Sequence, residues 1–199
     1  AQLEATYEGP EAVQRRQLSV TMTHPVFLAQ YKNWMEDLEA IAARRSDMGA
    51  AVLVAAMKQW LWTLEYLQNN TDANGAKLYH SNRQGLTFSL ADALCWILGA
   101  QNLVLDIVEL EEKGPQNPTL AEGLPGLVAF LSDLAYVQCA RSAGESSRLC
   151  SELVFGYQVP GGVKADMAAA FHEMQADIAE GMAGSRLAKD HAGESLTKV

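Results

Sequence analysis

Ser89-Leu90-Ala91-Asp92-Ala93-Leu94-Cys95-Trp96-Ile97-Leu98 begins the stretch that decides the fold of this 199-residue chain. From here on, apolar residues recur at spacings of three, four and seven, which is the period of an amphipathic helix; they are Leu90, Leu94, Ile97, Val104, Ile107 and Leu110. Ser89 fits an N-cap, and Asp92 three residues later forms a weaker relative of the capping box. Gly114-Pro115 ends the pattern. The stretch therefore predicts a long helix that must bury one face against other helices.

The same period recurs on both sides of this helix, and no segment alternates with period two for long. His24-Pro25 interrupts the helical pattern, because the residue before a proline is pushed out of the helical region. Ser46 or Asp47 can cap the helix that carries Leu53 to Leu67. The expected helices are a short one over Pro10–Thr21 and long ones carrying Phe27 to Ile41, Leu53 to Leu67, Leu90 to Leu110, Leu127 to Leu153 and Met167 to Met182. We predict an all-α, antiparallel (up-and-down) bundle of about five long helices with a short N-terminal helix.

Three stretches between and after these helices lack the period. Residues 69–75 and 156–162 are rich in Asn, Gly and Pro and are expected to be loops. Residues 76–88 are ambiguous and are expected to be a linker with a short turn. The tail from Gly184 is polar and is expected to fray. The predicted division is residues 1–23, residues 24–185 as the bundle and residues 186–199 as a polar tail.

Composition restricts the function classes. Hydrophobic residues make up 49% of the chain, and its formal net charge is −9. An acidic chain is expected to avoid nucleic acid and anionic membranes, and no apolar run is expected to be long enough to span a bilayer. Cys95, Cys139 and Cys150 lack metal-like spacing and are expected to be buried free thiols in a reducing compartment. The four histidines also lack ligand spacing, so no metal site is predicted.

Two helical stretches carry features with more than one interpretation. Trp60 and Trp62 point to different faces of one helix, so one of them should meet solvent or a neighbouring domain. Four charged residues follow residue 140 at helical spacing: Arg141, Glu145, Arg148 and Glu152. They form either a solvated face with weak pairs or a polar seam that pairs with Asp92 or Asp106 of the preceding long helix.

Near the start of the chain, Tyr7-Glu8-Gly9-Pro10 precedes a helical pattern. Gly9 fits an N-cap, and Pro10 fits the first helical position, where its missing N–H costs nothing. Glu8 would then lie beside a helix N-terminus, which favours anions. On this evidence alone Glu8 is either an ordinary helix-start residue or a carboxylate placed for catalysis.

Tyr7-Glu8-Gly9, followed by Val13-Gln14-Arg15, resembles the C-terminal signature of acyl-CoA dehydrogenases, which usually reads Tyr/Phe-Glu-Gly-Thr with a Gln-Arg pair shortly after. The resemblance implies that Glu8 is the base that removes the α-proton of an acyl-CoA, and that Tyr7, Gly9 and Pro10 lie against FAD. Pro10 stands where the family usually has Thr, and Ala12 stands where Gln is frequent.

The resemblance also implies an origin for the chain. In the family this signature lies near the end of a larger enzyme, so residues 1–23 would end its catalytic part. The rest would match the extra helical domain of longer members. The expected activity is oxidation of acyl-CoA to 2-enoyl-CoA in a homodimer, with electron-transfer flavoprotein as the electron acceptor. The expected location is the bacterial cytoplasm or the mitochondrial matrix. The alternative is a non-catalytic helical domain for oligomerisation, partner docking or membrane association.

Overall fold

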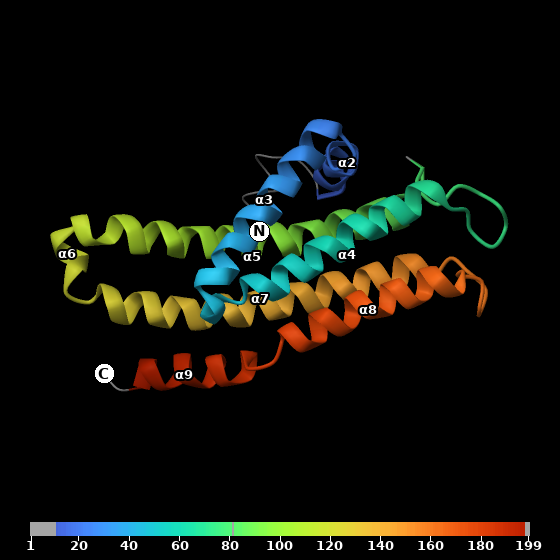
Figure 1. Ribbon diagram of the computed structural model, residues 1–199. Coiled ribbons are helices and arrows are strands. Elements are labelled where there is room, and N and C mark those ends of the chain that lie inside the picture. Colours follow the sequence, from blue (N-terminus) through green and yellow to red (C-terminus); the bar gives the residue numbers. More distant parts are fainter. Residues whose placement is uncertain (1–10, 81, 198–199) are drawn as a thin grey trace.

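The computed structural model describes residues 11–80 and 82–197 and shows an all-helical bundle (Figure 1). Within those ranges there is no strand, and Thr71 and Lys77 form an isolated β-bridge. The predicted fold class is confirmed. The elements are α2 (Glu11–Thr21), α3 (Pro25–Arg44), the 3₁₀ turn η1 (Ser46–Met48), α4 (Ala50–Asn69), α5 (Gln84–Lys113), the 3₁₀ turn η2 (Gly114–Gln116), α6 (Pro118–Ala121), α7 (Leu124–Phe155), α8 (Ala165–Gly181) and α9 (Ser185–Thr197).

The helix α7 holds the bundle together. It packs against α4, α5, α8 and α9, while α4 also contacts α3, α5 and α8. Figure 1 shows α5 and α7 as an antiparallel pair joined through α6, with α3 crossing above them. Residues of α4, α5 and α7 supply most of the buried apolar core, in which Trp60 is the largest fully buried side chain. Burial of this apolar surface is the main stabilising term of the fold.

Gly49 sets how closely α4 approaches α7. Its φ is +72°, in the left-handed region, and a Cβ there would lie 2.7 Å from the Tyr136 side chain and 3.0 Å from Cys139 Cβ. Glycine is therefore required at this position both by backbone conformation and by space. Gly49, rather than Ser46 or Asp47, is the N-cap of α4, so that capping prediction is wrong.

The start of α5 also differs from the prediction. The helix begins at Gln84, and the Ser89 hydroxyl donates to the Gly85 carbonyl at 2.8 Å, inside the helix. A serine in a helix interior can bond to the carbonyl four residues before it, so Ser89 did not need to be a cap. Pro25 and Gly114 fall at a helix start and a helix end as expected.

The polar tail forms a helix where fraying was expected. Helix α9 packs on α7 and buries Ala188 and Ala192. The chain bends into it at Gly184, whose φ is +91°. The Tyr136 hydroxyl of α7 donates to the Ala183 carbonyl at this bend. Helix α9 packs through these two small alanines. It lacks the stripe of large apolar residues from which a helix is predicted in a sequence.

In the part of the chain that the structure describes, one helical stretch, Gln84–Gln116, is long and apolar enough to cross a membrane by length and composition. Its most apolar window has a mean hydropathy of 1.5, so the expectation that no run is long enough is wrong. Core helices of helical bundles meet the same criterion, and α5 packs here against α7, α4 and α2. Length and composition therefore do not distinguish a membrane span from a core helix.

Candidate functional site

The residues of the predicted catalytic site, Tyr7, Glu8, Gly9 and Pro10, lie outside the described residues. The described structure begins directly after them, at Glu11, with helix α2. Helix α2 packs against α5 and has no buried residue. The structure therefore shows where the second half of the signature lies, on the flank of α5.

Arg15 of the signature ties α2 to the bundle. Its guanidinium lies 2.6 Å from a Glu11 carboxylate oxygen on its own helix and 2.9 Å from Asp92 on α5. Burial raises the pKa of the Asp92 carboxyl, and the charge of Arg15 opposes that increase. The N-terminal helix is held by this partly shielded pair, by packing of Leu18 against the core and by the Tyr79 hydroxyl, which donates to the Ser19 carbonyl at 2.6 Å.

A hollow of about 420 Å³ lies beside this ion pair, between α2, α5 and α7. It is lined by Arg15, Asp92, Cys95, Trp96, Gly99, Gln138, Arg148 and Leu149.

The Arg141 guanidinium lies over the Trp96 ring, 5.3 Å from its centroid, a cation–π contact. Arg148 pairs with Glu145 at 3.0 Å and Glu152 at 2.6 Å on its own helix. The pairs of Arg148 within α7 agree with the first alternative, a solvated face with pairs along one helix. Asp92 pairs with Arg15 of α2, so it does not form the alternative polar seam with the charged residues of α7.

The thiols provide no nucleophile at neutral pH. Cys139 and Cys150 are buried, and burial raises their pKa to about 12 and about 11. Cys95 is exposed at the edge of the hollow, so the expectation that it is buried is wrong. Partial burial, with the nearby Asp92 charge, raises the pKa of the Cys95 thiol as well. A thiol with a raised pKa stays protonated and unreactive at neutral pH.

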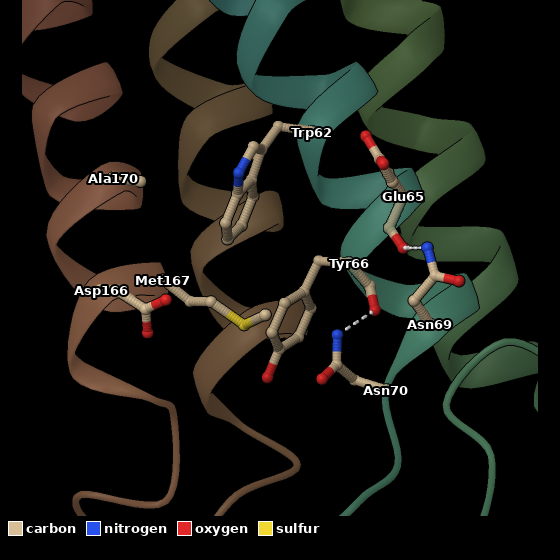
Figure 2. Close-up of a pocket in the computed structure, with 8 residues that line it drawn as sticks. All are labelled: Trp62, Glu65, Tyr66, Asn69, Asn70, Asp166, Met167 and Ala170. Atoms are coloured by element: carbon tan, nitrogen blue, oxygen red, sulfur yellow. Dashed lines mark hydrogen bonds between the residues drawn. The ribbon is translucent and has the colours of Figure 1, made fainter.

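A second hollow, of about 330 Å³, lies between the end of α4 and the start of α8 (Figure 2). The Trp62 and Tyr66 rings stack there, with centroids 5.5 Å apart and planes 12° from parallel. The lining residues are Trp62, Glu65, Tyr66, Asn69, Asn70, Asp166, Met167 and Ala170. The sequence indicated only that Trp60 and Trp62 face different ways. The structure buries Trp60 fully and places Trp62 at this half-exposed wall.

Within residues 11–80 and 82–197, no three His, Cys, Asp or Glu side chains lie close enough together to hold a metal ion. Comparison of the chain with protein-family models, with curated proteins and with solved structures gives no match.

Proposed function

We propose that this chain is the C-terminal part of a flavin-dependent acyl-CoA dehydrogenase that oxidises acyl-CoA to 2-enoyl-CoA. The observation that carries the proposal is the signature itself: Tyr7-Glu8-Gly9, followed at the family's spacing by Val13-Gln14-Arg15. In this proposal Glu8 removes the α-proton of the substrate. The enzyme is a homodimer of the bacterial cytoplasm or the mitochondrial matrix, and it passes electrons to an electron-transfer flavoprotein.

The described structure supports this proposal in one way: α2 leaves Val13 and Val20 exposed, by 57% and 64%. Residues seven apart lie on one face of a helix. An exposed apolar face is available there for the catalytic part of the enzyme to cover.

In this proposal Glu8 acts as a general base. A carboxylate is a weak base when it is fully hydrated, and burial beside an apolar acyl chain would raise its pKa toward the working pH. FAD, held in part by Tyr7, Gly9 and Pro10, would accept the hydride from the β-carbon when bound. The task of Glu8 is then to hold and accept one proton at a carboxylate oxygen.

Turnover of the full-length enzyme with Glu8→Gln tests the proposal. We expect the rate of acyl-CoA oxidation to fall by about 10²-fold to 10⁴-fold, which is the usual contribution of a positioned base, with the visible flavin spectrum retained. Glu11→Gln is the matched control, because Glu11 lies on the surface and, among the described residues, its ion-pair partner is Arg15. Near wild-type turnover in the Glu8 variant would rule out this role.

The second candidate is a non-catalytic helical domain for oligomerisation, partner docking or membrane association. The exposed Val13 and Val20 favour it equally well, since a partner could cover the same face of α2. The two proposals differ in what the parent protein carries. A coding sequence upstream of Ala1 that supplies a flavin-binding part, together with a yellow purified protein, supports the enzyme. A colourless parent protein supports the module.

A further inference from the structure

We propose that α8 is a movable strap: it opens as a unit from α4 and α7 while the other helices stay folded, and its opening brings the buried Gln59 amide into contact with water. Figure 1 shows α8 on the outside of the bundle, beside α4 and α7. The proposal does not depend on the dehydrogenase proposal, because α8 contains none of the signature residues.

The position of Gln59 beneath α8 follows from the register of the two helices. Each helix presents residues seven apart, which share one face; they are Val52, Gln59 and Tyr66 on α4 and Met167, Met174 and Gly181 on α8. At one end, a Cβ at Gly181 would lie 2.9 Å from the Val52 Cβ. At the other end, Met167 reaches toward the Tyr66 ring (Figure 2). Gln59 therefore faces Met174, midway between these two contacts.

The closed position of α8 is costly at Gln59. The side chain is fully buried, and neither Nε2 nor Oε1 has a hydrogen-bond partner within the described residues. The Met174 thioether is a weak acceptor and has no proton to donate. Water that reached the amide would supply the missing hydrogen bonds, so opening of α8 regains what closing loses.

The contact between α8 and α7 leaves a hollow of about 450 Å³. Its lining from α7 is small or polar and consists of Gly144, Ser147, Arg148, Ser151 and Glu152. Along this hollow α7 therefore offers α8 few large apolar side chains to pack against.

The strap itself is little buried. Of its 17 residues, Phe171 and Ile178 are buried, whereas more than half of α4 is buried. Met167 and Met174 are partly exposed, and methionine side chains are flexible enough to leave and re-enter a packed surface. Opening of α8 therefore exposes less apolar surface than opening of a core helix, and it costs less free energy.

Both ends of α8 are tied down just outside the helix. Before it, the Gln158 side-chain amide donates to the Thr71 carbonyl at 2.7 Å, and Gly161, with a φ of +77° and open space around it, follows. After it, the Tyr136 hydroxyl donates to the Ala183 carbonyl, directly before Gly184, whose φ is +91°. These anchors keep the neighbouring segments in place while the helix between them moves.

Hydrogen exchange of the full chain, measured by NMR at low urea concentrations, tests the proposal. Amides between Phe171 and Ile178 should share one opening free energy and exchange at least about tenfold faster than the slowest amides of α4 and α7. Their exchange should depend little on urea, because a local opening exposes little surface. Progressively slower exchange toward the middle of α8 would indicate fraying from its ends and overturn the proposal, as would protection equal to that of α4.

Gln59→Met tests the role of the buried amide. Exchange in the middle of α8 should slow by about 5-fold to 30-fold, because opening no longer frees an unpaired amide; this range corresponds to about 1–2 kcal/mol. Gln101→Met on α5 is the matched control: Gln101 is 3% exposed, and its Oε1 also has no partner within the described residues. Gln101 stays buried when α8 opens, so this variant should leave exchange in α8 unchanged. Unchanged exchange in Gln59→Met, or equal slowing in the control, would contradict the proposed strap.

Discussion

At the scale of single residues, Gln59 is the most costly polar side chain in the core. It is fully buried on α4, and neither Nε2 nor Oε1 has a hydrogen-bond partner within the described residues. A buried amide without partners loses its hydrogen bonds to water and gains nothing in return.

We expect Gln59→Met to raise the free energy of unfolding by about 1–2 kcal/mol, because methionine has a similar length and no polar atoms to satisfy. Urea unfolding followed by circular dichroism measures the change. Gln17→Met on the exposed α2 is the matched control and should change stability by less than about 0.5 kcal/mol. A lower stability for Gln59→Met would instead mean that the amide is satisfied by buried water.

The buried thiols predict a loss of stability at alkaline pH. Burial raises the pKa of Cys150 from 9.0 to about 11 and that of Cys139 from 9.0 to about 12. Above pH 9.0 the unfolded chain loses these protons while the folded chain keeps them, so stability should fall as pH rises toward 11. Unfolding in urea at several pH values should show a shallower decline for Cys139→Ala with Cys150→Ala than for the wild type. Parallel declines would contradict this cause.

At the scale of elements, the bend between α8 and α9 depends on a side chain of α7. The Tyr136 hydroxyl donates to the Ala183 carbonyl, and the Gly181 carbonyl lies 3.4 Å away. This contact joins the last helix to the centre of the bundle just before α9 begins.

Tyr136→Phe should lower the free energy of unfolding by about 1 kcal/mol, the usual net value of one hydrogen bond. Hydrogen exchange measured by NMR should become faster in α9 while amides of α4 and α5 stay protected, because the lost contact is local. Tyr157→Phe is the control, since the Tyr157 hydroxyl makes no hydrogen bond within the described part of the chain. Equal acceleration in all helices would contradict a local role.

One helix boundary was predictable because backbone chemistry determines it: Pro25 starts α3 through its fixed φ and missing N–H. Gly114 falls at the end of α5 as expected, but its backbone is still helical, with φ −56° and ψ −37°, and a Cβ there would lie 2.7 Å from the Leu124 side chain. The starts of α4 and α5 and the whole of α9 were missed. These depend on tertiary packing, as at Gly49 against Tyr136, and packing partners are not adjacent in the sequence.

At the scale of the whole molecule, the apolar period of the long helices was sufficient to predict an all-α bundle. The candidate sites were less accessible to sequence reasoning. Glu8 stands out only through a family signature, because a glutamate before a helix is common. The hollow between α4 and α8 joins Trp62 and Tyr66 to Asp166, which are far apart in the sequence. Only the packing of α4 against α8 brings those residues together.

The position of α7 at the centre of the bundle also affects how the chain can be made. Helix α4 buries residues along almost its whole length, and much of that face lies against α7. During synthesis α4 emerges long before Phe155, the last residue of α7. The nascent chain must therefore carry an uncovered apolar helix for much of its elongation, and a gene truncated before α7 would encode a polypeptide prone to aggregation rather than a smaller domain.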